Sequence, residues 1–151
     1  MRELYTEIEI DASAETVWDI LLDFTRYPAW NPFVTSIEGP AVEGERITIH
    51  LEPPSGKTMT FKPTVVSCEE PWEFAWLGHL FIPGIFDGKH IFEIAAHGKG
   101  KVQFVQREEF RGLIVPLLWK SLDTDTRSGF EAMNIALKAR AESKLKDSFG
   151  S

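Results

Sequence analysis

The sequence predicts an α+β fold in which a curved antiparallel β-sheet wraps around a long C-terminal α-helix, with two short helices after the first strand. Apolar and polar residues alternate in short runs through the first two thirds of the chain, whereas the last third has a helical period. The sequence contains no internal repeat, linker or low-complexity segment. We therefore expect residues 1–151 to form a single domain.

The N-terminal segment predicts one strand followed by two short helices. Residues 4–10 alternate in polarity, which is typical of a half-buried strand. Ser13 offers an N-cap, and the apolar residues after it have helical spacing, which predicts a helix at about 14–23. The segment 27–32 contains two prolines, so we expect a second short helical turn there, and then a strand at 33–38.

The middle of the chain predicts an antiparallel meander. In the segment 59–65, Pro63 lies in phase with the apolar residues, so this strand should lie at a sheet edge or carry a bulge. Turn residues separate short segments in which the apolar residues share one parity, at 47–51, 59–65, 74–76, 86–96 and 102–110.

The last third predicts the long helix. It begins near Pro116 and runs to about residue 147, roughly 30 residues or about 45 Å. Weak helix formers at 123–126 and at Gly129 predict a kink. Six apolar residues form one stripe: Leu118, Leu122, Phe130, Met133, Leu137 and Ala141. A curved sheet and a straight helix cannot touch along their whole length, so a gap between them is the candidate site.

Several segments resemble the START-related superfamily, the helix-grip group of polyketide cyclases, lipid-transfer domains and birch-pollen-allergen-like proteins that is often called SRPBCC. They cover the chain in the expected order: IDASAETVWDIL (10–21), DF (23–24), YPAWNPF (27–33), GKHIF (88–92), QREEFRGL (106–113), GFEAMN (129–134) and ALKAR (136–140). The last two resemble the C-terminal helix of small bacterial members. The resemblance implies the helix-grip fold, in a superfamily of transporters, ligand sensors and cyclases.

Charge and composition exclude several classes of partner. A net charge of −7 without a basic stripe argues against a nucleic-acid partner and against attraction to an anionic membrane surface. No apolar run approaches the roughly 18 residues of a membrane span, and the start of the chain lacks a signal peptide, so we expect a cytoplasmic protein without stable membrane insertion. The four histidines and the single Cys68 have no metal-ligand spacing, and we expect no metal or other cofactor.

Strand parity places three polar side chains among aromatic residues on the face that should line the gap. Gln106 and Glu108 share the parity of the apolar residues in their strand, and His90 does so in the neighbouring strand. A carboxylate that faces an apolar cavity has its charged form disfavoured, so Glu108 could act as an acid or base, with His90 sharing the proton. Two alternatives stay open: a buried polar cluster that satisfies itself, or a Glu108 paired with Arg127 of the helix.

The leading hypothesis is a protein that binds or carries a small hydrophobic molecule, such as a lipid, an aromatic or a polyketide. The alternatives are a cyclase- or dehydratase-type enzyme that uses Glu108 and His90, and an interaction module without a ligand whose partner could be a second copy. The expected wall of the ligand site is Trp76, Phe86, His90, Phe92, Phe104, Gln106, Glu108, Phe130, Met133 and Leu137.

Two loops are unusually apolar for connecting segments. Residues 80–86 have the sequence LFIPGIF, and residues 112–119 have the sequence GLIVPLLW. Connectors are ordinarily polar because they lie at the surface. We expect both loops to fold over the mouth of the cavity or to contact a partner.

Overall fold

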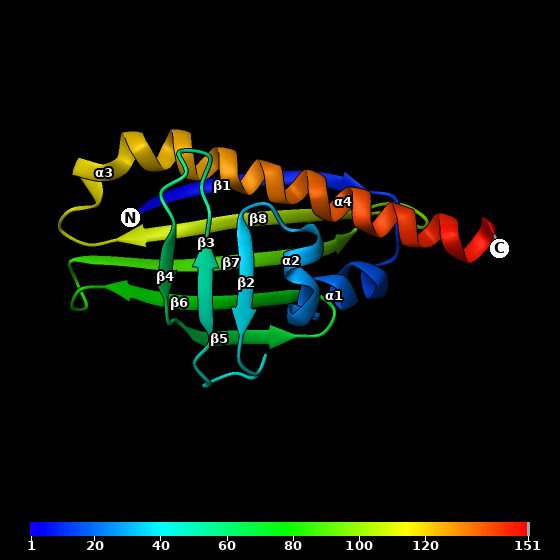
Figure 1. Cartoon of the computed structure of the whole chain (residues 1–151), viewed down its shortest axis with the longest axis horizontal. Helices are drawn as coiled ribbons and strands as arrows, with labels where there is room; N and C mark the ends of the chain where they lie inside the picture. Colours follow the sequence, from blue (N-terminus) through cyan, green and yellow to red (C-terminus); the bar gives the residue numbers. More distant parts are fainter. Residues whose placement is uncertain (151) are drawn as a thin grey trace.

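The computed structural model describes residues 1–150, with side chains for residues 1–144. A five-stranded antiparallel sheet has the order β1-β8-β7-β6-β5, and a separate three-stranded sheet has the order β2-β3-β4. Figure 1 shows the C-terminal helix lying along β1. The larger sheet consists of β1 (Arg2–Ile10), β5 (Thr64–Glu69), β6 (Glu73–Leu80), β7 (Phe86–Ala96) and β8 (Val102–Arg111). The smaller consists of β2 (Val34–Glu38), β3 (Thr48–Leu51) and β4 (Met59–Phe61).

The long β7–β8 hairpin places the predicted residues on one face. In the β7–β8 pair, His90 lies opposite Glu108 and Phe92 lies opposite Gln106, so all four side chains project from the same face. On the outer face of β8, Arg107 forms ion pairs with Glu93, Glu109 and Glu3. These carboxylates raise the pKa of the guanidinium against the opposing effect of partial burial. The charged groups on the sheet therefore lie mainly outside, and the apolar face is turned inward.

The short helices after β1 follow the prediction closely. Helix α1 spans Ala14–Leu22, and the hydroxyl of Ser13 caps it by accepting a hydrogen bond of 3.1 Å from the backbone N–H of Thr16. A 3₁₀ turn (Phe24–Arg26) and the four-residue helix α2 (Tyr27–Trp30) follow. The hydroxyl of Tyr27 donates a 2.6 Å hydrogen bond to the carbonyl of Leu21, which fixes α2 against α1.

The segment around Pro63 differs from the prediction of a single strand. It forms two strands, β4 and β5, that belong to different sheets, because proline has no N–H to donate to a ladder. The predicted single meander therefore divides, although an isolated bridge between Arg46 and Thr64 joins the two sheets at this point. The division turns β2, β3 and β4 away from the plane of the larger sheet, where they form another wall of the site.

The long C-terminal helix has the irregular turn that its sequence predicts. Helix α3 (Val115–Ser121) continues through a π-helical turn (Leu122–Thr126) into α4 (Arg127–Gly150). The hydroxyl of Thr124 donates to the carbonyl of Lys120 at 2.9 Å, a side-chain bond typical of a distorted helix. The buried stripe on α4 consists of Phe130, Met133, Leu137 and Ala141, four members of the predicted set.

Gly129 is needed at the point where α4 approaches β2. A Cβ atom there would overlap the ring of Phe33, which is itself buried. Helix propensity alone predicts that Gly129→Ala stabilises an exposed helix by about 1 kcal/mol. We expect the opposite here: urea unfolding should show a loss of about 1–3 kcal/mol, because the ring must move. Ser143→Ala, at an exposed site on α4, is the control. A stabilised Gly129→Ala variant would contradict this packing.

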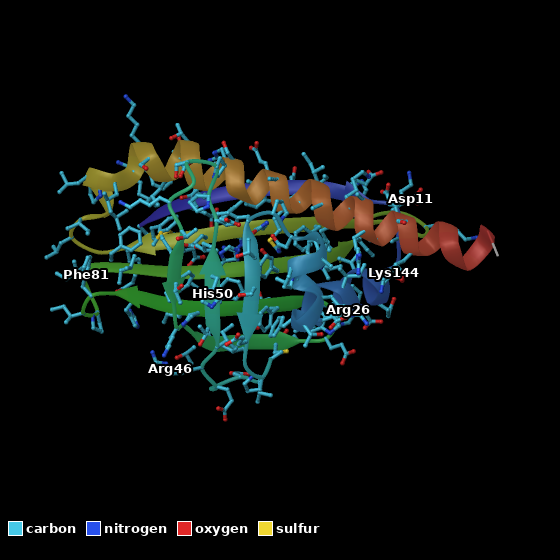
Figure 2. The ribbon with its side chains drawn as sticks, viewed as in Figure 1. Asp11, Arg26, Arg46, His50, Phe81 and Lys144 are labelled. Atoms are coloured by element: carbon cyan, nitrogen blue, oxygen red, sulfur yellow. The ribbon has the colours of Figure 1, made fainter. Side chains whose placement is uncertain are left out.

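Exposed side chains include residues at both ends of this scaffold. Figure 2 shows Phe81 at one end of the molecule, in the β6–β7 loop, and Arg26 and Lys144 toward the other end. No helix in the described part of the chain is long and apolar enough to cross a membrane.

Candidate ligand-binding site

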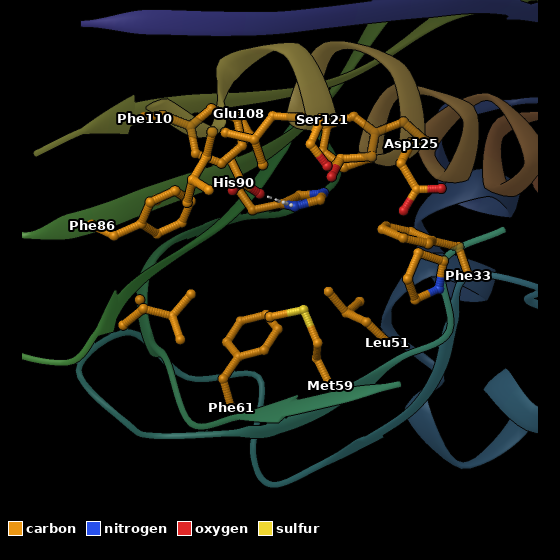
Figure 3. A pocket seen from close by; sticks show the side chains of 18 of the residues that line it. Phe33, Leu51, Met59, Phe61, Phe86, His90, Glu108, Phe110, Ser121 and Asp125 are labelled. Carbon is orange, nitrogen blue, oxygen red and sulfur yellow. Dashed lines mark hydrogen bonds and ion pairs between the residues drawn. The ribbon is translucent and has the colours of Figure 1, made fainter. Parts of the chain in front are cut away.

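A cavity of about 660 Å³ lies between the larger sheet, the smaller sheet and the helical segment around the π turn. This volume is in the range of sites for small organic ligands. Its wall is mostly apolar, with Phe61, Met59 and Leu51 on one side and Phe86, Phe110 and His90 on the other (Figure 3). The complete wall is Phe33, Leu51, Pro53, Ser55, Lys57, Met59, Phe61, Trp76, Gly78, His79, Leu80, Phe86, Gly88, His90, Glu108, Phe110, Leu118, Ser121, Leu122, Asp125, Thr126 and Phe130.

Half of the residues predicted to line the ligand site do line this cavity. They are Trp76, Phe86, His90, Glu108 and Phe130. They come from β6, β7, β8 and α4, and strand parity alone places those on the strands on the inner face. The sheet and the helix therefore do leave a gap where these residues meet.

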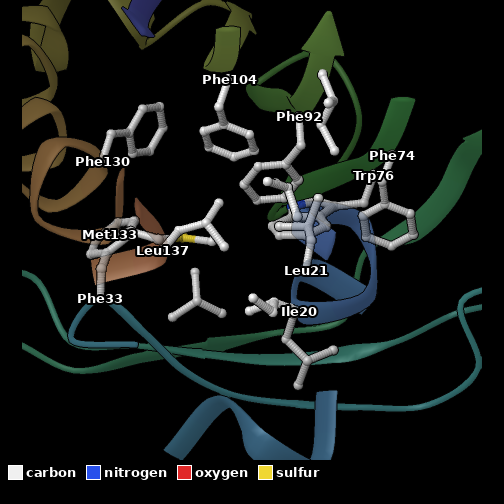
Figure 4. Close-up of a cluster of buried hydrophobic side chains, with 14 of the residues drawn as sticks. Ile20, Leu21, Phe33, Phe74, Trp76, Phe92, Phe104, Phe130, Met133 and Leu137 are labelled. Atoms are coloured by element: carbon white, nitrogen blue, oxygen red, sulfur yellow. The ribbon is translucent and has the colours of Figure 1, made fainter. Parts of the chain in front are cut away.

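The other five predicted wall residues do not line the cavity. Phe92, Phe104 and Leu137 belong to a solid core (Figure 4), together with Met133, whereas Gln106 is buried in a polar network beside it. At this end of the sheet, α1 and α4 lie close enough for their side chains to fill the space, and Leu21 of α1 is completely buried. The gap is therefore confined to the end of the sheet that α1 does not cover.

The wall that the smaller sheet contributes was not among the residues predicted from the sequence. Leu51, Met59 and Phe61 close the cavity opposite β7 and β8, and Ser121 and Asp125 border it from the helical side. The shared parity of Met59 and Phe61 was visible in the sequence. What the sequence could not show is that the chain turns at Pro63 and places these strands across the inner face of the larger sheet.

A chain of hydrogen bonds links β1, β8 and α4 beneath the cavity. The hydroxyl of Thr6 donates to the backbone carbonyl of Gln106 at 2.7 Å, so its oxygen accepts the 2.9 Å bond from Nδ2 of Asn134. Oδ1 of Asn134 then accepts from Nε2 of Gln106 at 2.7 Å, and the carbonyl of Phe130 accepts from the same amide at 3.3 Å. This order of donors and acceptors fixes which way the Gln106 amide points.

The fixed amide of Gln106 determines the protonation pattern of His90. Oε1 of Gln106 lies 2.9 Å from Nε2 of His90, so Nε2 must carry a proton to make this bond. On the other side of the ring, Nδ1 lies 2.8 Å from Oε1 of Glu108, a contact that needs one proton between the two atoms. The His90–Glu108 pair therefore holds one shared proton, as imidazolium and carboxylate or as neutral imidazole and carboxylic acid.

Both members of the pair line the cavity, but aromatic rings enclose His90, and Glu108 is the more exposed of the two. The imidazole stacks on Trp76 with the ring centroids 4.6 Å apart, and it lies 4.8 Å from the ring of Phe130. The side chain of His90 is 4% exposed and that of Glu108 is 17% exposed. Oε2 of Glu108 lies 2.7 Å from the position that a Cβ at Gly88 would occupy, so the glycine gives the carboxyl group its space.

The predicted alternative partner of Glu108 is not observed. Arg127 instead makes hydrogen bonds to Asp123 at 2.8 and 3.1 Å and to the backbone carbonyl of Tyr5. Its place at the start of α4 directs the guanidinium toward β1 and away from the cavity. The other alternative, a polar cluster that satisfies itself, is met in part. Both ring nitrogens of His90 and both amide atoms of Gln106 have hydrogen-bond partners within the cluster or on the backbone of α4.

A hydrogen-bonded loop borders the cavity near the π turn. In the β3–β4 loop, the backbone N–H and the hydroxyl of Ser55 donate to the two carboxylate oxygens of Asp125 at 3.2 and 3.1 Å. Asp125 lies in the π-helical turn, where the wider backbone carries it toward the loop. In the described residues, no cluster of three or more His, Cys, Asp or Glu side chains has a geometry suited to a metal ion.

The two apolar loops meet at one end of the molecule, beside the cavity. The backbone N–H groups of Leu113 and Ile114 donate to the carbonyls of Gly84 and Ile85 at 3.1 and 3.2 Å. Leu80 and Phe86 flank the first loop and line the cavity, but Phe81 between them points outward (Figure 2). The edges of the two loops therefore border the cavity, whereas their tips are exposed.

A long helix gripped by an antiparallel sheet, with two short helices after the first strand and a cavity at the open end, defines a helix-grip protein. The sequence matches the family described as "Polyketide cyclase / dehydrase and lipid transport" over residues 1–142. The chain belongs to this family, within the START-related SRPBCC superfamily. No curated protein sequence matches the chain.

Solved structures agree with this fold at low sequence identity. A START superfamily protein from Mycobacterium smegmatis aligns with a TM-score of 0.72 and 23% identity, covering 93% of this chain and 97% of that one. The Zhui aromatase/cyclase from Streptomyces sp. R1128 aligns with a TM-score of 0.77 and 16% identity, covering 95% of each chain. The protein Ara h 8.0201 aligns with a TM-score of 0.70 and 14% identity, covering 94% and 98%. These likenesses show the shared fold.

Proposed function

We propose that the protein binds and carries a small, largely apolar molecule in the cavity between the two sheets and the helix. The observation that carries this proposal is the cavity itself, about 660 Å³ in volume and lined by Phe33, Phe61, Trp76, Phe86 and Phe110 among others. An aromatic wall of this kind favours apolar ligands through burial of their surface. Membership of a family described by cyclase, dehydrase and lipid transport agrees with such a ligand.

The protonation pattern of the wall specifies the polar end of the ligand. In both forms of the His90–Glu108 pair, the shared proton lies between Nδ1 and Oε1, so Oε2 of Glu108 is left as an acceptor. Among the described residues, no protein group donates a hydrogen bond to Oε2. The ligand that fits is therefore an apolar body with a hydroxyl or amine group that donates to Glu108.

The same shared proton favours a second candidate, a cyclase- or dehydratase-type enzyme. General acid–base chemistry needs a proton that can move between the protein and the substrate, and the His90–Glu108 pair holds one beside an apolar cavity. Loss of water from a β-hydroxy ketone probe, followed through the absorbance of the conjugated enone that forms, tests this candidate. Turnover that disappears in Glu108→Ala would support the enzyme candidate. Absence of turnover by the wild type would contradict it and would leave ligand binding without catalysis.

Native mass spectrometry of the protein, purified without detergent, tests the binding proposal. We expect a bound species of one apolar molecule per chain, which leaves when the protein is unfolded. Extraction of the sample with organic solvent should recover that molecule. A folded protein that retains nothing and does not bind N-phenyl-1-naphthylamine would contradict the proposal and favour the interaction module without a ligand.

A further inference from the structure

Four apolar side chains protrude together at the end of the molecule beside the cavity. Phe81 and Ile82 lie in the β6–β7 loop, Leu113 follows β8, and Leu117 lies in the first turn of α3. Their exposed fractions range from 66% for Ile82 to 82% for Leu117. We call this group the apolar tip. Side chains of this size are seldom exposed in a group without a partner.

The charges around the apolar tip are the reverse of those on the rest of the protein. The chain has 23 acidic and 16 basic residues, yet residues 79–87 and 111–122 contain His79, Arg111 and Lys120 and a single acidic residue, Asp87, whose carboxylate is already held by His79 and the backbone N–H of Gly84. Arg2 adds a third cation, because it lies over the ring of Trp119 in α3 at 5.3 Å from the centroid. The net charge of −7, which argues against an anionic membrane for the chain as a whole, therefore conceals one end at which basic side chains outnumber acidic ones.

From these observations we propose that the apolar tip docks on the surface of an anionic lipid bilayer. Protruding apolar side chains can enter the boundary between headgroups and acyl chains, while flanking cations contact anionic headgroups. A fluid bilayer can accommodate protruding side chains without a complementary surface. A protein partner, in contrast, would need a surface complementary in shape to side chains that protrude from three separate segments. The contact is peripheral and reversible, in keeping with the expectation of no stable membrane insertion.

The position of the apolar tip determines which part of a docked protein would face the bilayer. Leu80 and Phe86, which line the cavity, flank the loop that carries Phe81 and Ile82, and Leu118 of the wall follows Leu117 directly. A docked protein would therefore turn the edge of its cavity toward the lipid. The docking is independent of the proposed function, because it depends on outer side chains that do not line the cavity.

Sedimentation with vesicles tests the docking. We expect binding to phosphatidylcholine vesicles that contain phosphatidylglycerol, and much weaker binding to phosphatidylcholine alone. The double variant Phe81→Ser/Ile82→Ser should bind about tenfold or more weakly, because most of the inserted surface is lost. The matched control is Ile135→Ser on α4, where an isoleucine of similar exposure lies outside the apolar tip.

The contribution of the cations beside the apolar tip is tested separately. Arg111→Gln should weaken binding to the anionic vesicles about fivefold at low salt and less at high salt, whereas Arg26→Gln, an exposed control away from the apolar tip, should leave it unchanged. Circular dichroism verifies that all variants are folded.

Three results would overturn the docking proposal. The first is that the folded wild type binds neither kind of vesicle. The second is that the tip variants bind as the wild type does. The third is a dimer, seen by sedimentation velocity without lipid, that Phe81→Ser/Ile82→Ser abolishes, since the apolar tip would then be an interface between two copies. Ligand retention in the cavity is measured separately, so its failure would leave these results intact.

Discussion

The Gln106→Leu variant should lose about 3–5 kcal/mol of unfolding free energy, a large part of the stability of a domain of this size. Leucine fits the space but removes an amide that makes three hydrogen bonds, to His90, Asn134 and the carbonyl of Phe130. The Nε2–H of His90 and Oδ1 of Asn134 would then be buried without partners, at a cost of about 1–3 kcal/mol each. Urea unfolding, followed by tryptophan fluorescence, measures the loss.

Gln103→Leu provides the matched control for this variant. Gln103 lies on the same strand, β8, but on the outer face, so the same change should alter the unfolding free energy by no more than about 0.5 kcal/mol. Equal stability of the two variants would show that the network around Gln106 contributes nothing beyond shape. It would also remove the reason to assign the proton on Nε2 of His90.

The Glu108→Ala variant should bind 1-naphthol about 10–100-fold more weakly than the wild type, while its affinity for naphthalene stays within about threefold. The two probes share one apolar body, and they differ in the hydroxyl that donates to Oε2 of Glu108. Loss of this hydrogen bond, which leaves the hydroxyl of the probe without a partner in an apolar cavity, accounts for a difference of this size. Competition with a fluorescent apolar probe measures both affinities.

Glu109→Ala separates the effect of position from the effect of charge. Glu109 is the neighbouring residue on β8, but it points outward and pairs with Arg107. This variant should bind both probes as the wild type does. Equal losses for naphthol and naphthalene in Glu108→Ala would contradict the assigned acceptor, because they would reflect a change in the shape of the cavity.

The elements that local sequence rules govern could be predicted from the sequence. Strand parity placed His90, Gln106 and Glu108 on one face, and the register of β7 and β8 confirms it. The weak helix formers at 123–126 predicted the irregularity that is observed as the π turn. These features depend on residues that are neighbours in the chain or across one hairpin, and the local pattern of apolar and polar residues reflects such contacts.

The extent of the cavity could not be predicted in the same way. Phe92 and Phe86 have the same parity on β7, yet Phe92 is in the solid core and Phe86 lines the cavity. The difference arises from where α1 packs, and from the turn at Pro63 that brings Met59 and Phe61 across the sheet. Contacts between segments that are distant in the sequence leave no periodic signal. Strand parity therefore predicts which face of the sheet points inward, but not how much of that face is filled by core side chains and how much lines the cavity.

An NMR titration with N-phenyl-1-naphthylamine tests most directly whether the cavity holds an apolar molecule. Gly78 and Gly88 line the cavity, and Gly98 and Gly100 lie in the turn at the far end of β7 and β8. We predict that the amide signals of Gly78 and Gly88 shift and saturate at one probe per chain, while those of Gly98 and Gly100 stay in place. Shifts confined to residues outside the cavity, or no saturable shift in a folded protein, would contradict the account.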